Sequence, residues 1–184
     1  ARGVEDGSEG LPLAVDMDGT LILTDMSWVS FIRVIIRKPW MLPSMLLKEL
    51  TGRRAEWKRD LGERLIFNPA EIEYHAEFLD WLTGEHTKGR LVILATVSDR
   101  LVAEQIAGYV GLFSDVMASD VSFNLRGKKK AEALVARFGE GGFSYAGNSK
   151  HDLDVWSHAG EVIVVNPERG LLNRIGDDVD IVFE

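Results

Sequence analysis

An apolar run near the start of the chain ends in two acidic residues that could do chemistry. Residues 13–15 are Leu-Ala-Val, and residues 16–20 read DMDGT. An apolar run of this kind is typical of a buried parallel strand, so Asp16 would lie at the carboxyl end of that strand, where open α/β sheets bind ligands. Asp18 follows two residues later, and Gly19 permits a sharp turn because it has no Cβ atom. Two carboxylates this close repel each other, which favours either protonation of one acid or a bound Mg²⁺ or Ca²⁺.

The same five residues are also typical of a simple turn, since Asp and Gly are common turn residues. Three later segments decide between the two interpretations. The apolar run 91–96 ends in Thr96, with Ser98 close behind; Lys128, Lys129 and Lys130 open a predicted helix; and residues 147–152 read GNSKHD. Each segment has an ordinary structural explanation as a strand-end hydroxyl, a solvated helix face, or a turn with a helix cap. Lysines at a helix N-terminus nevertheless oppose the helix dipole, which favours an anion nearby.

Taken together, these side chains could carry out phosphoryl transfer. A carboxylate can attack phosphorus directly and form an aspartyl-phosphate. A second acid can protonate the leaving oxygen and then deprotonate the water that hydrolyses the intermediate. A hydroxyl and an ammonium group can bind the phosphoryl oxygens on which charge builds up, and a cation can offset the repulsion between the acids.

At this point the sequence resembles the haloacid dehalogenase (HAD) superfamily of Mg²⁺-dependent phosphatases. The family's four motifs are similar in type and order to DMDGT at 16–20, Thr96 at a strand end, Lys130 in GKKK and GNSKHD at 147–152. The resemblance spans residues 11–167. It implies an α/β, HAD-like Rossmannoid parallel sheet with a small helical C1-type cap, and hydrolysis of a small phosphorylated substrate through an aspartyl-phosphate.

The resemblance also implies a role for each motif residue. Asp16 would be the nucleophile and Asp18 the acid/base, with the backbone carbonyl of Asp18 also binding Mg²⁺. Phosphate would be bound by Thr96, Lys130, Gly19 and Thr20, and the metal by Asp16, Asp18, Asn148 and Asp152. Lys128 is the alternative to Lys130.

One position departs from the family pattern, which is usually GDxxxD. Asn148 stands where the first of these acids is expected. An amide oxygen can still bind Mg²⁺ or a metal-bound water, but one negative charge is lost. We therefore expect a lower metal affinity, and we keep a second hypothesis in which the domain is a catalytically weak regulatory or binding module.

Apolar periodicity predicts the elements that position these residues. From residue 89 onward, strands alternate with helices, which is typical of a doubly wound parallel sheet. The strands are predicted at 91–96, 116–119, 143–147, 162–165 and 180–183, and the helices at 99–110, 128–138, 152–159 and 170–175. Asp99 is predicted to cap a helix that ends at Gly111. Only helices are predicted between residues 25 and 87, the last opening at Asn68-Pro69 and ending at Gly84. We therefore expect a flexible tail at 1–10, a core formed by 11–24 and 88–184, and a helical cap at 25–87.

The composition limits the classes of function. The 184 residues carry a formal net charge of −8, which argues against a nucleic-acid partner. The absence of cysteine excludes disulfides and thiolate chemistry. The first residues are acidic and Gly-rich, unlike a signal peptide, and the missing initiator Met suggests a piece of a longer chain. We expect a cytoplasmic location.

Longer stretches are similar to the HAD domain fused to UbiA-like polyprenyl transferases, notably residues 94–120, 124–139 and 145–156. This resemblance implies a membrane-embedded transferase partner, a place at the inner face of a membrane, and an isoprenoid or sugar phosphate as substrate. Apolar residues of the expected cap could then meet lipid or a prenyl chain, although a core of the cap is the simpler explanation: Trp28, Phe31, Ile35, Trp40, Met41 and Leu46.

A third hypothesis is a receiver domain of a two-component relay, which also gathers acids, Thr and Lys at the end of a parallel sheet. The helical insertion directly after the first acidic strand argues against a receiver domain. The order of the DMDGT residues argues against it as well.

Overall fold

The computed structural model describes residues 10–23, 68–119, 125 and 127–184. The tail at 1–9 and the helices predicted between residues 24 and 67 lie outside the described residues. The apolar residues proposed for a membrane contact lie there too, so these predictions stay untested.

A six-stranded parallel sheet forms the centre of the described chain, in the order β3-β2-β1-β4-β5-β6. The strands are β1 (Leu13–Val15), β2 (Val92–Asp99), β3 (Asp115–Ser119), β4 (Ser144–Gly147), β5 (Glu161–Val165) and β6 (Ile181–Phe183). The order reverses beside β1, which pairs in parallel with β2 on one side and β4 on the other. The predicted α/β fold with a doubly wound parallel sheet is confirmed.

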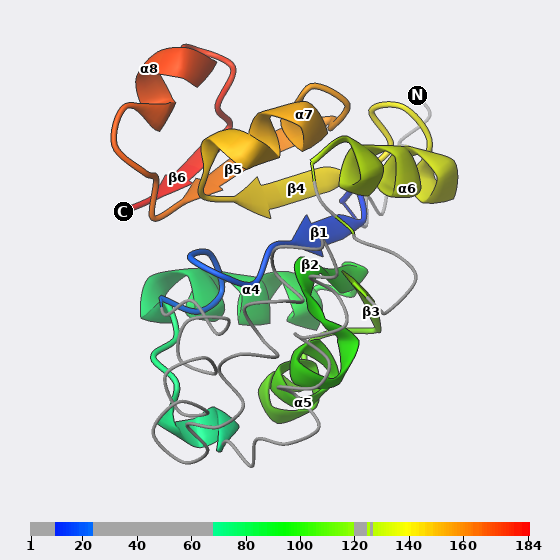
Figure 1. Ribbon diagram of the computed structural model, residues 1–184, viewed down its shortest axis with the longest axis vertical. Coiled ribbons are helices and arrows are strands. Elements are labelled where there is room, and N and C mark those ends of the chain that lie inside the picture. The colour runs from blue at the N-terminus through cyan, green and yellow to red at the C-terminus, as the bar shows by residue number, and fades with distance from the viewer. Residues whose placement is uncertain (1–9, 24–67, 120–124, 126) are drawn as a thin grey trace, which may run out of the picture.

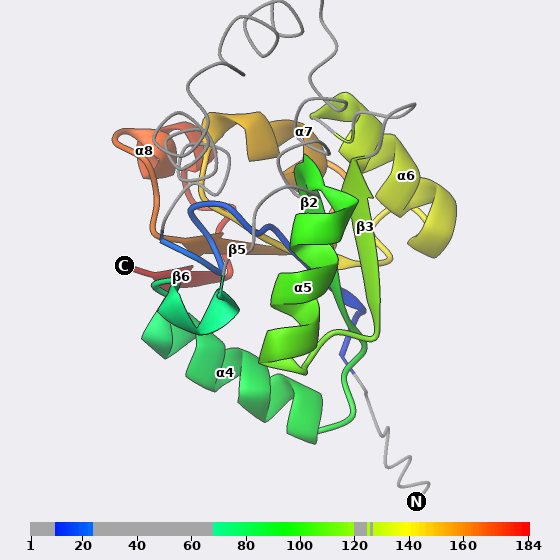
Figure 2. The same cartoon turned by 60° about the horizontal axis from the view of Figure 1, so that its bottom comes forward.

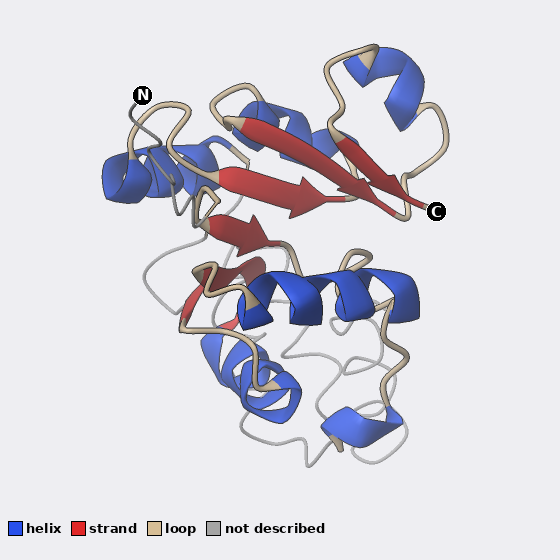
Figure 3. Cartoon of the chain, turned by 180° about the vertical axis from the view of Figure 1, so that it is seen from behind, coloured by secondary structure: helices blue, strands red, loops and turns tan. Residues whose placement is uncertain are grey.

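Helices cover both faces of this sheet (Figure 1 and Figure 3). The helical elements are η2 (Pro69–Glu71), α4 (Ala76–Thr87), α5 (Arg100–Val110), α6 (Lys128–Phe138), η3 (Lys150–Asp152), α7 (Leu153–Trp156) and α8 (Leu171–Ile175). In Figure 1, α4 and α5 lie below the sheet and α6, α7 and α8 lie above it. Figure 2 shows α4 and α5 together from another side. This two-faced covering explains why the central strands are continuous apolar runs rather than alternating ones.

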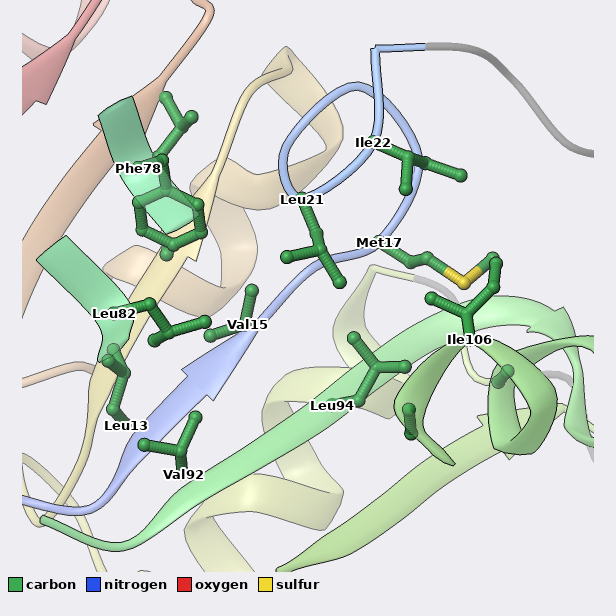
Figure 4. Close-up of a cluster of buried hydrophobic side chains, with 14 of the residues drawn as sticks. Leu13, Val15, Met17, Leu21, Ile22, Phe78, Leu82, Val92, Leu94 and Ile106 are labelled. Atoms are coloured by element: carbon green, nitrogen blue, oxygen red, sulfur yellow. The ribbon is translucent and has the colours of Figure 1, made fainter. Parts of the chain in front are cut away.

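Two buried clusters form the core, one on each face of the sheet. Leu13 and Val15 of β1 pack with α4 and α5, whereas Ala14 between them belongs to the cluster beneath α6, α7 and α8. Figure 4 shows the first cluster, in which Leu21 from the loop after β1 lies near Val15 and Met17 lies near Ile106. The apolar residues that flank the DMDGT motif therefore fix the loop on which the acids lie.

Helix α4 differs from the prediction in its bounds and in its packing. The sequence predicted one helix from Asn68 to Gly84, but residues 69–71 form only the short η2 helix and α4 starts at Ala76. His75 caps α4, its Nδ1 accepting a hydrogen bond of 3.2 Å from the N–H of Phe78. Phe78 and Leu82 are completely buried in the same cluster as β1. This helix, which we expected in the cap, therefore packs on the sheet as part of the core.

Other bounds shift by a few residues. Strand β2 continues past Thr96 to Asp99, and the helix predicted at 152–159 is a short η3 followed by α7. The predicted Asp99 cap and Gly111 end of α5 are confirmed, because Asp99 Oδ2 accepts the N–H of Leu101 and Gly111 has a φ of 72°.

The two ends of the segment between β1 and α4 lie side by side. Leu23 donates its N–H to the carbonyl of Glu73 at 2.9 Å, and His75 donates to the carbonyl of Leu21 at 3.0 Å. Ile22 forms an antiparallel bridge with Tyr74 between them. The two described segments on either side of residues 24–67 therefore meet beside the core.

Within the described ranges, no helix combines the length and the apolar character needed to cross a membrane.

Candidate active site

The loops after β1 and β4 and the last residues of β2 meet at the carboxyl edge of the sheet, where the strand order reverses. Asp16 directly follows β1 and donates its N–H to the carbonyl of Ala146 in β4, at 2.9 Å. This backbone hydrogen bond holds Asp16 beside the end of β4 without any side-chain contact. This is the position at which parallel α/β sheets bind ligands.

The carboxylate of Asp16 pairs with Lys130, which lies in the first turn of α6. Lys130 Nζ lies 2.9 Å from Asp16 Oδ1, and both residues are more than nine-tenths buried. Burial raises the pKa of Asp16 to about 7, against the lowering effect of Lys130 and with a further rise from Asp152 and Asp18. Burial opposes the charge of Lys130, but these acids outweigh it and raise the pKa of the ammonium group. The ammonium group of Lys130 therefore stays charged, and it lies beside Asp16, whose ionised form is disfavoured by burial.

Tyr145 of β4 connects Lys130 to Asp152. The ammonium group of Lys130 donates to Tyr145 Oη at 2.9 Å, and this hydroxyl donates to Asp152 Oδ1 at 2.7 Å. Lys130 Nζ itself lies 4.0 Å from Asp152 Oδ1. That distance is too long for a hydrogen bond.

Asp152 is held firmly by the turn that precedes it. Its Oδ2 accepts the backbone N–H groups of Asn148 at 3.1 Å and Ser149 at 3.0 Å, together with the Ser149 hydroxyl at 3.3 Å. Ser149 also caps η3, which completes a capping box with Asp152. These bonds leave Oδ1 as the oxygen of Asp152 that faces Tyr145 and Lys130.

A second group of side chains comes from β2. The hydroxyl of Ser98 donates to Asp18 Oδ2 at 2.5 Å, and the N–H of Ser98 donates to Thr96 Oγ1 at 3.0 Å. The Thr96 hydroxyl thus accepts a backbone hydrogen bond, and its own proton can be donated to another oxygen. Thr96 and Ser98 are both buried.

Gly19 brings the turn after β1 against Asn148. Gly19 has a φ of 79°, and a Cβ atom placed there would lie 2.2 Å from Asn148 Nδ2. The carbonyl of Gly19 also accepts a hydrogen bond of 3.2 Å from Asn166 Nδ2. Asn148 therefore lies beside the loop that carries the two acids.

Thr20 differs from the other predicted phosphate ligands. Its side chain is completely buried, and among the described residues its hydroxyl has no hydrogen-bond partner. The assignments of Gly19 and Thr20 to phosphate binding stay predictions.

The donors gathered here suit a hard cation such as Mg²⁺. Asp16, Asp152 and the amide of Asn148 offer oxygen atoms, and hard cations prefer oxygen ligands. The negative charges of Asp152 and Asp18 raise the pKa of Asp16, an effect that a cation would offset. Among the described residues no group of three or more acidic, His or Cys side chains is placed to hold a metal.

Two residues of this site were not among the predicted ones. Tyr145 lies inside an apolar strand, where an aromatic residue is normally a core residue, and the sequence gives no signal for its hydroxyl. Ser98 was noted behind Thr96 but received no role. Its position two residues after a strand-end hydroxyl was the available signal.

Comparison with known proteins supports this fold. No family model matches the chain. The uncharacterized protein y4nM of Sinorhizobium fredii (strain NBRC 101917 / NGR234) is 32% identical over 155 residues, which is 84% of this chain. The chain spans only 30% of the length of y4nM.

Two solved structures are similar over most of the chain at low sequence identity. The HAD family hydrolase t0658 of Salmonella enterica subsp. enterica serovar Typhi has a TM-score of 0.62 and 14% identity, covering 90% of this chain and 67% of that one. A phosphoserine phosphatase in its apo form has a TM-score of 0.60 and 15% identity, covering 95% and 93%. The chain has the HAD-like fold. At these identities the likeness extends to the fold alone.

Proposed function

We propose that the chain is a Mg²⁺-dependent phosphatase that hydrolyses phosphate monoesters through an aspartyl-phosphate on Asp16. The observation that carries this proposal is the buried pair of Asp16 and Lys130, 2.9 Å apart at the carboxyl edge of the sheet. A carboxylate beside an ammonium group, with the hydroxyl of Thr96 on the neighbouring strand β2, is the set of groups that phosphoryl transfer needs. The similarity in fold to HAD family hydrolases supports the same activity.

In the first step an Asp16 carboxylate oxygen attacks phosphorus, and the bond between phosphorus and the ester oxygen breaks. Lys130 and the hydroxyl of Thr96 bind the phosphoryl oxygens, where negative charge accumulates in the transition state. Burial strengthens the contacts of Lys130 and of Thr96 with the phosphoryl oxygens, since electrostatic interactions are stronger where water is excluded.

Asp18 acts as the general acid and base. Its carboxyl group protonates the leaving alkoxide, then takes a proton from the water that attacks the acyl phosphate and regenerates Asp16. The hydroxyl of Ser98, 2.5 Å from Asp18 Oδ2, holds this carboxyl group in one orientation.

Mg²⁺ would be held by the carboxylates of Asp16 and Asp152, the amide oxygen of Asn148 and the backbone carbonyl of Asp18. When bound, it supplies positive charge that offsets the repulsion among the acids and the phosphoryl group.

The test is a phosphate-release assay with Mg²⁺ on a panel that includes phosphoserine, sugar phosphates and isoprenoid phosphates. We expect turnover of at least one monoester and formation of a beryllofluoride adduct on Asp16, detected by ¹⁹F NMR. Absence of phosphate release across the panel, together with absence of the adduct, would overturn the proposal. We favour isoprenoid and sugar phosphates as the substrate class because of the resemblance to domains fused to prenyl transferases.

Asn148 favours one second candidate, a catalytically weak regulatory or binding module. One negative charge fewer beside Asp16 and Asp152 lowers the attraction for a divalent cation. The Asn148→Asp variant separates the two candidates. A gain of about tenfold or more in turnover at a limiting Mg²⁺ concentration supports the weak module, and an unchanged or lower rate relative to an active wild type supports the phosphatase.

We also propose that the domain works beside a membrane-embedded, UbiA-like transferase at the inner face of a membrane. The match to less than a third of y4nM supports a place in a longer chain. Flotation of the purified protein with anionic liposomes tests the membrane part. Failure to float with vesicles of any anionic content would count against a direct membrane contact.

A further inference from the structure

Tyr145 is a buried side chain whose two hydrogen bonds both end on proposed active-site residues. It is completely buried in β4, accepts from Lys130 at 2.9 Å, and donates to Asp152 at 2.7 Å. Neither bond is needed to fill the core, because the ring alone packs at the edge of Trp156.

The geometry determines how the three N–H bonds of Lys130 are used. A lysine ammonium group has three N–H bonds and no acceptor. One donates to Asp16 and one to Tyr145, while Asp152 lies at 4.0 Å, beyond hydrogen-bond distance. Among the described residues no third acceptor lies within hydrogen-bond distance, so the third N–H bond can serve a ligand at the carboxyl edge of the sheet.

Without the hydroxyl of Tyr145, Lys130 would have a stronger partner within easy reach. A lysine chain is flexible, and a carboxylate 4.0 Å away attracts the ammonium group strongly in a buried site. Lys130 would then bridge Asp16 and Asp152 directly. Such a bridge would put a positive charge against Asp152 Oδ1, an oxygen that now accepts the neutral hydroxyl of Tyr145 and keeps a second lone pair for a cation.

We propose that Tyr145 is a positioning residue that keeps the ammonium group of Lys130 off Asp152, so that Asp152 stays available to a divalent cation and Lys130 to a phosphoryl oxygen. For the phosphoryl oxygen, this inference rests on the proposed function. For the cation, it rests only on the oxygen atoms of Asp16, Asp152 and Asn148. With Asn148 in the place of an acid, Asp152 and Asp16 supply the carboxylates of the proposed site, which makes the separation from Lys130 more important.

The test measures Mn²⁺ binding to the complete chain by electron paramagnetic resonance, a readout that needs no turnover. In Tyr145→Phe the ring is kept and only the hydroxyl is lost. We expect the dissociation constant for Mn²⁺ to rise about fivefold or more, because the ammonium group now competes for Asp152. Tyr74→Phe is the matched control, since the hydroxyl of Tyr74 donates only to the carbonyl of Pro69 at 2.9 Å. It should bind Mn²⁺ as the wild type does.

A double-mutant cycle separates positioning from general loosening of the site. In a Lys130→Met background no ammonium group is present to move. Tyr145→Phe should then change the dissociation constant for Mn²⁺ by less than about twofold. An equal loss of Mn²⁺ affinity with and without Lys130 would overturn the proposal, as would wild-type affinity in Tyr145→Phe itself.

A second variant covers the case in which Tyr145→Phe does not fold. Site-specific 3-fluorotyrosine at position 145 keeps both the ring and the hydroxyl, but makes the oxygen a weaker acceptor for Lys130. Weaker Mn²⁺ binding supports the proposal and unchanged binding overturns it. The two proposals can fail separately. If the wild type releases no phosphate, the proposed function fails, but Mn²⁺ binding can still be compared between the wild type and the Tyr145 variants.

Discussion

Single residues carry most of the chemistry, and the sequence predicted them unevenly. Asp16, Lys130 and Asp152 come together as their motif positions suggested, since strand ends fix where such residues lie. Tyr145 and Ser98 were missed as functional groups because their roles depend on hydrogen bonds across the sheet. The residues next to Tyr145 and Ser98 in the sequence do not indicate these hydrogen bonds, which become visible only in the three-dimensional structure.

Asp16→Asn tests the proposed nucleophile. The amide cannot attack phosphorus, so we expect phosphate release to fall by at least about 10³-fold. The fold should survive, because burial already raises the pKa of Asp16 to about 7 and a neutral amide costs less to bury.

Phosphate-release rates and circular dichroism of the same preparation provide the measurement. Asp115→Asn is the control: this acid lies in β3, half exposed and paired with Arg137 at 2.6 Å, outside the site. Activity of Asp16→Asn comparable to that of Asp115→Asn would mean that Asp16 is not the nucleophile.

Gly19→Ala tests the close approach of the acidic loop to Asn148. The φ of 79° is unfavourable for alanine, and the new Cβ atom would lie 2.2 Å from Asn148 Nδ2. We expect a loss of about 1–3 kcal/mol in the free energy of unfolding, together with weaker Mg²⁺ activation as the Asn148 amide is displaced.

Urea unfolding and the Mg²⁺ dependence of activity measure the two effects. Gly108→Ala is the matched control, because Gly108 lies within α5 and a Cβ atom there meets nothing within 4 Å. That change should stabilise the protein by up to about 1 kcal/mol. Equal stability of the two variants would contradict the packing described for Gly19.

At the level of elements, helix bounds that depend on neighbouring residues were predicted well. Bounds that depend on pairing between distant segments were not. The bounds of α5 and α6 follow from Asp99, Gly111 and the apolar spacing, all of which lie within the helices or next to them. The segment before α4 was predicted as helix from Asn68, but Ile22 pairs with Tyr74 and competes with that helix. The sequence of residues 68–84 contains no signal that Tyr74 pairs with Ile22, 52 positions earlier. The start of the helix was therefore predicted too early.

Arg90 connects several elements at the amino edge of the sheet, opposite the proposed site. Its guanidinium group donates to the carbonyl of Leu11 at 2.7 Å, to Ser144 Oγ at 2.6 Å and to Glu161 at 2.6 Å. It also donates to Glu85 near the end of α4 at 2.9 Å. The cluster thus ties α4 to the starts of β1, β4 and β5.

Glu85→Gln tests this cluster through its dependence on pH. Burial raises the pKa of Glu85, but hydrogen bonds from Lys88 and Arg90 outweigh burial and lower it below 4.5. The unfolded chain therefore binds this proton more readily than the folded protein, and the stabilisation is present above about pH 4.5 and lost as pH falls through the folded pKa.

We expect Glu85→Gln to lower the free energy of unfolding by about 1–2 kcal/mol at pH 7, and by progressively less below pH 4.5. Urea unfolding of both proteins between pH 3 and 7 measures the difference. A difference that stays constant across this range would show that the charge of Glu85 contributes no stability.

For the whole molecule, the doubly wound parallel sheet followed from the alternation of strands and helices, but the extent of the core did not. The expected boundary at residue 88 separated α4 from the sheet because only helices were predicted between residues 25 and 87. Phe78 and Leu82 show why that pattern misleads: both are completely buried in the same cluster as β1. The core thus includes a helix that the sequence places next to a helical insertion.

The insertion itself can be tested as a separate unit because its two ends lie side by side. Leu23 and Glu73 are joined by a backbone hydrogen bond of 2.9 Å, and Ile22 bridges Tyr74. Replacing residues 25–70 by a Gly-Ser-Gly linker would close this pair of segments with a short turn, as in a β-hairpin. Asp16, Lys130, Tyr145 and Asp152 all lie outside the replaced segment.

We expect the shortened protein to unfold cooperatively and to hydrolyse p-nitrophenyl phosphate, a substrate with little to recognise beyond its phosphoryl group. Discrimination among the larger phosphate esters of the panel should fall, because a cap over the site would supply those contacts. The ratios of kcat/KM between substrates, measured for both proteins, give the comparison. If the shortened protein kept the full ratios, specificity would reside in the core, and residues 25–70 would not act as a cap over this site.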